Sequence, residues 1–188
     1  MKMRTFIAVE IPEFLREEFV QLQERLKKSD ADVKWVEPEN MHLTLKFLGD
    51  TEENKMEKIS EILKRIAQET KQFEITFSDL GAFPNLNFPK VIWVGVDKGK
   101  KELAELATRI ENGLLPLGFS KEKRTYSAHL TLGRIRSPKN KDKLKKILEE
   151  KIEIKEKGKF YLQKIVFFSS KLTPTGPIYT KLAEFPFS

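Results

Sequence analysis

The tetrapeptide His42-Leu43-Thr44-Leu45 recurs as His129-Leu130-Thr131-Leu132, and these two copies contain the only histidines of the 188-residue chain. Histidine is the side chain whose ordinary pKa lets it give or take a proton near neutral pH. Two of them in matched settings, 87 residues apart, predict that the chain repeats itself, that the two sites share one task, or both.

We expect each motif on a strand, where side chains alternate between two faces. The histidine and the threonine of each copy then share a face, so His42 lies beside Thr44, and His129 beside Thr131. The leucines face the core, and Phe47 is expected to face it with them. Each copy therefore presents an imidazole next to a hydroxyl.

A shift by the spacing of the histidines aligns other parts of the chain. The strand-like run 6–10 falls on 93–97, and the helical pattern after Pro12 falls on the pattern after Gly99. The order strand, helix, motif strand, helix, strand recurs in both halves. We expect the turn-rich segment 81–89 to be the hinge between them.

We predict an α+β fold of two pseudo-symmetric lobes with the active-site cleft between them. Each lobe is expected to be a small, mostly antiparallel sheet with outer helices. The whole chain would form a single bilobal domain, residues 1–188, with an approximate internal repeat (1–85 and 88–170) and C-terminal strands (166–188).

The composition predicts an anionic partner. The net charge is +7, which favours nucleic acid. Cysteine is absent, and no apolar run approaches the ~18 residues of a membrane span. We therefore expect a cytoplasmic monomer with no membrane segment and no obligate protein partner. Heavy use of Lys and Glu also resembles the composition of thermophile proteins.

Positive charge is concentrated around the second motif. Between Lys121 and Lys146, ten Lys or Arg residues stand against two acidic residues. The lysines within 139–150 are best explained as the solvated face of a helix. Those nearest the motif favour an anion site. These are Lys123, Arg124, Arg134 and Arg136.

Two imidazoles and two hydroxyls in basic surroundings suit a phosphodiester. One neutral histidine would take a proton from attacking water, and the other, protonated, would give a proton to the leaving oxygen. The hydroxyls would donate to the non-bridging oxygens, and an arginine would neutralise the growing charge. This scheme needs no metal and no other cofactor. A zinc site, the alternative, would need three or four ligands, of which each motif supplies one.

The motifs and their flanks carry a family resemblance. The stretch 35–49, Trp-Val-Glu-Pro-Glu-Asn-Met-His-Leu-Thr-Leu-Lys-Phe-Leu-Gly, and the stretch 126–134, Tyr-Ser-Ala-His-Leu-Thr-Leu-Gly-Arg, resemble the motif regions of the two-histidine phosphoesterase superfamily. Within it the chain is similar to the bacterial and archaeal RNA 2',3'-cyclic phosphodiesterases, which are LigT-like and historically named 2'-5' RNA ligases. The resemblance covers essentially the whole chain.

The resemblance implies hydrolysis of an RNA 2',3'-cyclic phosphate end to a 2'-phosphomonoester. It makes His42 the proton donor to the departing 3'-oxygen and His129 the proton acceptor that activates water. Strand alternation gives two partners without a direction, so this polarity rests on the resemblance. Members of the family also join RNA ends by a reversible, nucleotide-independent 2'-5' ligation.

Four further residues are candidates for substrate binding. The resemblance makes Arg134 a phosphate ligand, although its odd spacing from His129 would turn it to the leucine face unless Gly133 hosts a bulge. Lys46, by its even spacing from His42, is expected on the histidine side. The aromatic rings nearest the motifs are candidates for stacking on an RNA base. These are Trp35 and Tyr126.

Two alternatives to an RNA cyclic phosphodiesterase remain at this point. One is a phosphodiesterase that acts on small cyclic nucleotide phosphates with the same histidines. The other is an RNA-binding module without catalysis.

Overall fold

The computed structural model describes residues 1–150, 154 and 158–188. The parts of the expected second repeat at 151–153 and 155–157 lie outside the described residues. In chain order the described elements are β1 (Lys2–Glu10), α1 (Glu13–Lys27), β2 (Val33–Trp35), the 3-10 turn η1 (Pro38–Asn40), β3 (His42–Glu52), η2 (Glu53–Lys55), α2 (Met56–Gln68), β4 (Phe73–Phe83), β5 (Val91–Val96), α3 (Lys100–Leu114), η3 (Leu115–Leu117), β6 (His129–Ile135), α4 (Lys141–Glu149), β7 (Lys159–Leu162), β8 (Lys164–Thr173) and β9 (Gly176–Pro186).

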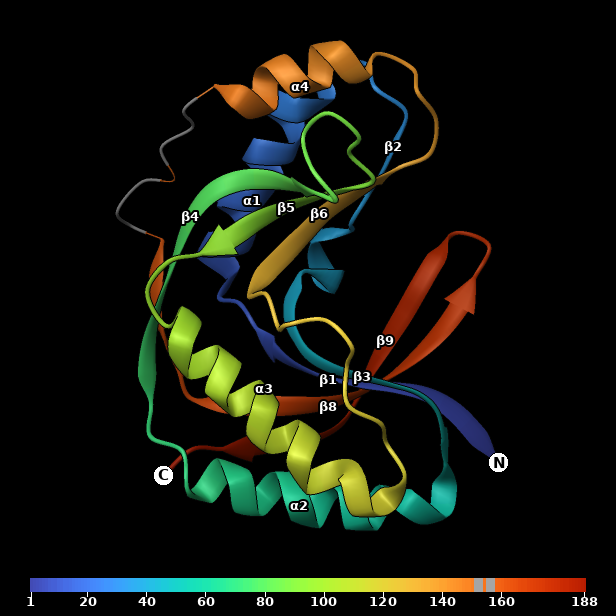
Figure 1. Ribbon diagram of the computed structural model, residues 1–188, viewed down its shortest axis with the longest axis vertical. Helices are drawn as coiled ribbons and strands as arrows, with labels where there is room; N and C mark the ends of the chain where they lie inside the picture. Colours follow the sequence, from blue (N-terminus) through green and yellow to red (C-terminus); the bar gives the residue numbers. More distant parts are fainter. Residues whose placement is uncertain (151–153, 155–157) are drawn as a thin grey trace.

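The described strands form one curled sheet in which every pairing is antiparallel (Figure 1). The order is β7-β4-β5-β6-β3-β1-β8-β9, and β2 adds to β6 from the side. The predicted α+β class, with antiparallel sheet and outer helices, is confirmed. The sheets of the two halves are continuous rather than separate, because β3 and β6 pair at the centre through Leu43 and Leu130.

The helices cover the two ends of this sheet. In Figure 1, α2 and α3 lie together beneath β1, β3 and β8, and α1 and α4 lie at the opposite end, beside β4, β5 and β6. Each helix pair combines one helix from each half of the sequence, because α1 leaves β1 and crosses to the far end. An edge-on contact between Phe19 of α1 and Phe77 of β4, with ring centres 4.9 Å apart, secures this crossing.

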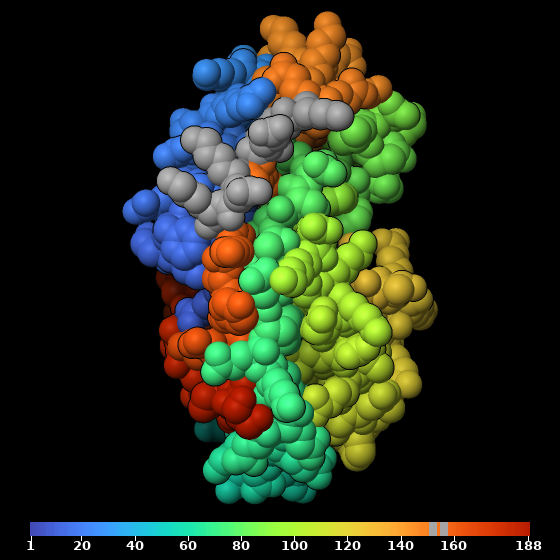
Figure 2. Space-filling model, turned by 90° about the vertical axis from the view of Figure 1, so that its left-hand side faces the viewer, coloured from blue at the N-terminus to red at the C-terminus, as the bar shows by residue number. Residues whose placement is uncertain are grey.

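The expected hinge at 81–89 is not a hinge. Residues 81–83 belong to β4, which pairs with β5 up to Phe83 and Val91, so residues 84–90 form the turn of a hairpin. β4, from the first half of the sequence, therefore lies in the same part of the sheet as β5 and β6. Figure 2 shows β4 (green) running along the side of the molecule, with α2 (teal) at its lower end.

Strand β1 is buried on both faces. Ile7 and Val9 belong to the main core beneath the helices, and Phe6 and Ala8 form a second, smaller cluster on the opposite face of the sheet. This second face matters for function, because the histidines lie on it.

Candidate active site

The two histidines lie at the centre of the sheet on neighbouring antiparallel strands. Leu43 of β3 faces Leu130 of β6, and both leucines are fully buried. One step away from this pair, alternation turns the side chains to the opposite face. The antiparallel register then sets His42 next to Thr131, and Thr44 next to His129. We call the face that carries these four side chains the histidine face.

The two imidazoles are held by the same contact. Nδ1 of His42 lies 2.6 Å from the carbonyl oxygen of Asn40, and Nδ1 of His129 lies 2.7 Å from the carbonyl oxygen of Ser127. A carbonyl only accepts, so Nδ1 carries the proton in each ring and donates it. Each neutral imidazole therefore keeps its lone pair on Nε2, the atom that is available for proton transfer.

The two Nε2 atoms differ in their partners. Nε2 of His42 lies 3.0 Å from the hydroxyl of Thr44, which donates to it when the ring is neutral. Within the described part of the chain, no side chain or backbone group hydrogen-bonds to Nε2 of His129. The pair is thus symmetric in its backbone anchoring and asymmetric at the reactive nitrogen.

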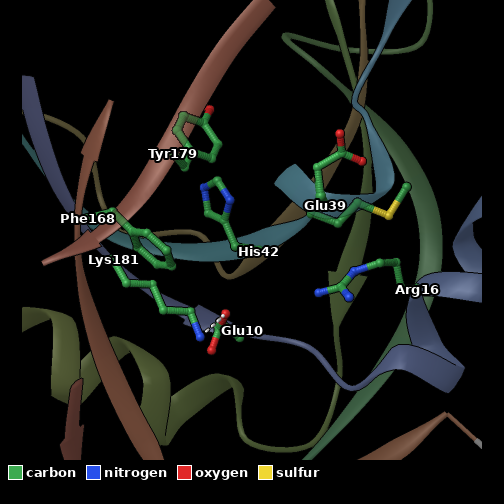
Figure 3. A pocket seen from close by; sticks show the side chains of 8 residues that line it. Glu10, Arg16, Glu39, His42, Phe168, Tyr179 and Lys181 are labelled. Atoms are coloured by element: carbon green, nitrogen blue, oxygen red, sulfur yellow. Dashed lines mark ion pairs between the residues drawn. The ribbon is translucent and has the colours of Figure 1, made fainter. Parts of the chain in front are cut away.

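His42 lies in an aromatic surrounding. Its ring centre is 5.0 Å from that of Phe6 and 5.3 Å from that of Tyr179, with Phe168 beyond. Figure 3 shows the ring between Tyr179 and Phe168, at a hollow of about 120 Å³ that an ion pair of Glu10 and Lys181 also lines. Burial lowers the pKa of His42 from 6.5 to about 4, although the Asn40 carbonyl opposes the shift.

His129 has its own aromatic neighbours. The ring of Phe83 meets it edge-on at 4.9 Å, and the ring of Trp93 lies 6.4 Å away. Burial lowers the pKa of His129 below its ordinary 6.5; the Ser127 carbonyl raises it, and the positive charge of Arg134 lowers it further. Both imidazoles of the free protein therefore favour the neutral form at pH 7.

A bulge in β6 turns Arg134 to the histidine face. Trp93 of β5 pairs with Thr131, but Ile92 pairs with Gly133, so Leu132 is an extra residue in β6. The extra residue shifts the alternation by one. A Cβ on Gly133 would lie 2.6 Å from a methyl of Val33, so this position needs glycine. The bulge that the sequence analysis raised at Gly133 is present. The charge of Arg134 is close enough to His129 to lower its pKa.

β3 has the same bulge at the equivalent residue. Ala8 of β1 pairs with Thr44, and Ile7 pairs with Lys46, so Leu45 is the extra residue. The prediction that Lys46 lies on the histidine face is therefore wrong. Lys46 is buried on the core face, where Nζ donates to Glu111 of α3 (3.2 Å) and to the carbonyl of Ser120 (2.9 Å).

The same bulge also changes the position of Phe47. The sequence predicts it in the core, but its side chain is 63% exposed. It pairs with Phe6 on the histidine face, with ring centres 6.1 Å apart.

A buried glutamine of α1 holds the β6 bulge. Gln23 is 3% exposed, and its Nε2 donates to the carbonyls of Leu132 and Val36, at 2.9 Å each. The Leu132 carbonyl also accepts from the backbone N–H of Val36. The bulge carbonyl, which leaves the regular ladder, is thereby satisfied. Next to the other bulge, Glu111 of α3 pairs with the buried side chain of Lys46.

The structure does not bring the aromatic candidates Trp35 and Tyr126 to the histidine face as stacking surfaces. Trp35 packs against the main core, above Gly133. Tyr126 also packs against the core, and its hydroxyl donates to the backbone carbonyl of Thr44 (3.0 Å). Tyr126 thus ties the segment before β6 to β3. The rings that do contact the histidines, Phe6, Tyr179 and Phe83, come from other strands, so no pattern within the motif strands predicts them.

The basic tract divides in the structure. Its last lysines lie on or next to α4, where Lys139 pairs with Asp30 and Lys145 with Glu149, so their explanation as a helix surface fits. Lys123 and Arg124 are exposed in the segment before β6. Of the tract, Arg134 lies on the histidine face.

The part of the chain that the structure describes has neither a candidate metal cluster nor a membrane-spanning helix. In that part of the chain, no group of three or more His, Cys, Asp or Glu side chains is close enough to hold a metal ion. None of the described helices has the length and apolar character to cross a membrane.

A family model described as LigT-like phosphoesterase matches the chain twice, over residues 9–93 and 94–179. The chain belongs to the LigT-like phosphoesterases. It is 38% identical to an RNA 2',3'-cyclic phosphodiesterase of Methanothermobacter thermautotrophicus over 185 residues, 98% of this chain and 99% of the relative. It is 40% identical to a protein of the same name from Methanocaldococcus jannaschii over 182 residues, 97% and 99% of the two chains.

The fold agrees with this membership. The crystal structure of E. coli LigT in its apo form superposes with a TM-score of 0.79 and 23% identity, and the match covers 100% of this chain and 98% of that one. The resemblance expected from the motif regions is thus confirmed. In this LigT-like chain the strand pairing also refines the sequence alignment, since Glu10 faces His42 but Gly95 faces His129. The second half therefore has two more residues between its first strand and its motif.

Proposed function

We propose that this phosphoesterase hydrolyses RNA 2',3'-cyclic phosphate ends to 2'-phosphomonoesters without a metal ion, with His42 and His129 as an acid–base pair. The observation that carries the proposal is the shared anchoring of the two rings, each held by Nδ1 on a carbonyl so that Nε2 is left for proton transfer. The relatives named RNA 2',3'-cyclic phosphodiesterase support the choice of substrate.

In the proposed reaction a water oxygen attacks phosphorus as His129 takes its proton. The bond between phosphorus and the 3'-oxygen breaks, and His42 gives that oxygen a proton. The phosphate stays on the 2'-oxygen, and the two histidines exchange protonation states. Nε2 of His129, which has no hydrogen-bond partner among the described residues, suits the proton acceptor.

Arg134 is the proposed ligand of the non-bridging oxygens, together with the hydroxyls of Thr44 and Thr131. Its guanidinium offers the paired donors that match phosphate geometry. Its charge is also the one that acts on His129. Stabilisation of the charge that grows in the transition state would come from these three side chains.

The same chemistry in reverse would join two RNA ends. A ribose 5'-hydroxyl would take the place of water, and the product would be a 2'-5' linkage. We propose this ligation as a second reaction of the same site, which needs no nucleotide.

The wider setting is also proposed. We expect one bilobal domain built from a duplicated unit, active as a monomer in the cytoplasm. The support is the twofold match of the family model, the absence of cysteine and the positive net charge.

Identification of the product tests the reaction. RNA that ends in 2',3'-cyclic phosphate is incubated with the protein and a chelator, and the product is separated against 2'- and 3'-phosphate standards. We expect the 2'-phosphomonoester at an unchanged rate with chelator. A 3'-phosphate, a loss of rate with chelator, or an intact cyclic end would contradict the proposal.

The polarity of the pair has a separate test. In a cyclic substrate with sulfur in place of the 3'-bridging oxygen, the sulfur leaves as a thiolate and needs little protonation. His42→Ala is expected to recover much of its lost rate on this substrate, and His129→Ala to recover none. The opposite pattern would reverse the assigned roles.

A further inference from the structure

Lys34 of β2 lies directly opposite Arg134 of β6. Directly opposite residues on neighbouring antiparallel strands point to the same face. The neighbours of Lys34, Val33 and Trp35, pack against the main core, and Lys34 itself is exposed. Lys34 therefore stands beside Arg134 on the histidine face.

The Lys34 side chain extends toward the β8–β9 hairpin. Its Nζ lies 3.8 Å from the position that a Cβ on Gly176 would take. The hairpin is held in this place by Asn40, whose Nδ2 donates to the Pro177 carbonyl (3.0 Å). The same hairpin carries Tyr179, the ring that contacts His42. The lysine thus lies at the His42 end of the histidine face.

The two cations have no acidic partner in the described part of the chain. Neither Lys34 nor Arg134 takes part in any of the ion pairs found there. Like charges directly opposite each other on a sheet are destabilising. Two neighbouring positive charges on the histidine face are therefore best explained by bound anions that compensate both of them.

We propose that Lys34 binds the phosphate on the 5' side of the terminal nucleoside, and so selects an oligoribonucleotide over a mononucleotide. The inference rests on the proposed function, in which Arg134 holds the cyclic phosphate. A nucleoside cyclic phosphate carries one phosphate charge, which leaves Lys34 without a partner. An RNA end brings a second phosphate one nucleotide away, and an ammonium on a flexible stem suits such a contact.

Three substrates separate the two phosphates. They are a nucleoside 2',3'-cyclic phosphate, a dinucleotide with a cyclic end, and the same dinucleotide with an uncharged methylphosphonate linkage. Wild type is expected to prefer the charged dinucleotide by about tenfold in kcat/KM, since hydrogen bonds to charged groups are among the stronger ones. Lys34→Met is expected to lose this preference and to treat the other two substrates as wild type does.

Two further variants make the test specific. Lys34→Arg keeps the charge and is expected to keep most of the preference, which a merely structural lysine would not require. Lys64→Met removes an exposed charge from α2, at the opposite surface of the helix layer, and is expected to change nothing. The salt dependence of kcat/KM for the charged dinucleotide should also become shallower in Lys34→Met alone.

The outcomes are distinct. An equal loss on all three substrates, or no loss on any, would overturn the second phosphate site. If wild type cleaved none of them, the proposed function would fail, and binding would decide the phosphate site. Calorimetry with a dinucleotide that ends in a 2'-phosphate should then give about tenfold weaker binding for Lys34→Met, and unchanged binding would contradict the inference.

Discussion

Phe47 and Arg134 occupy the same place in the two motif strands. Each stands five residues after a histidine, and each is turned to the histidine face by an extra leucine, Leu45 or Leu132, at the end of the tetrapeptide. One strand uses this place for an aromatic ring, and the other uses it for the positive charge. The chemical asymmetry of the site therefore begins at one pair of equivalent residues.

Arg134→Met should lower kcat/KM for a cyclic phosphate end by about 100- to 1000-fold, the usual loss for one transition-state donor. Because the charge of Arg134 lowers the pKa of His129, that pKa should rise in the variant, while the pKa of His42 stays. Only two histidines are present, so an imidazole NMR titration follows both. Arg65→Met, on the exposed side of α2, is the control. Unchanged turnover would remove Arg134 from the site.

Gln23→Met should act through Arg134. The methionine fills the same space but leaves the Leu132 and Val36 carbonyls without their amide donor, at a cost of about 1–3 kcal/mol in unfolding free energy. The loosened bulge should also lower kcat/KM by about tenfold. If Gln23 acts only through Arg134, then Gln23→Met should cause no further loss of kcat/KM in a protein that already carries Arg134→Met. Such non-additivity is the mark of two coupled residues. A kinetic loss that simply adds would assign Gln23 to stability alone.

Lys46→Met should lower stability and spare activity. Lys46 is buried, and its loss leaves the carboxylate of Glu111 without its cation, so the unfolding free energy should fall by about 3 kcal/mol in urea denaturation. Lys101→Met, which breaks an exposed pair with Glu105, should cost less than about 1 kcal/mol. Turnover per folded molecule should match wild type. A raised KM with unchanged stability would instead make Lys46 a substrate-binding residue.

The pH profile should be bell-shaped with its maximum on the acid side of 6.5. The working form has His42 protonated and His129 neutral. Because burial lowers the pKa of His42 to about 4, a single proton in the free protein favours His129, whose pKa is lowered below 6.5, and the working form is the minor of the two singly protonated forms. Its population still peaks between the two pKa values. The rate then falls at higher pH as the acid loses its proton, and at lower pH as the base gains one. A bound anion raises both pKa values, so kcat should peak at a higher pH than kcat/KM. A kcat/KM that climbs from pH 6 to 9 would exclude the pair.

The sequence predicts the elements and the reactive pair, but not the bulges that change which face the following side chains lie on. Alternation correctly turns His42, Thr44, His129 and Thr131 to one face, because those residues precede the extra leucine. It fails for the residues that follow. Leu45 looks like any inward leucine, and the bulge is visible only in the pairing with β1.

The crossing of α1 to the far end of the sheet is also not predicted by the local sequence. Gln23 reads as one polar residue on a helix, and its role depends on α1 crossing to the far end of the sheet, where it meets Leu132. Such contacts between distant segments are set by tertiary packing, which no local pattern records.

The most direct test of the central claim is the rate at which His42→Ala and His129→Ala hydrolyse an RNA 2',3'-cyclic phosphate end in the presence of chelator. General acid–base catalysis typically supplies ~10²–10⁴-fold in rate. We expect each variant, with wild-type circular dichroism, to lose about 1000-fold or more. A folded variant of either kind that kept its rate within tenfold of wild type would contradict the acid–base pair.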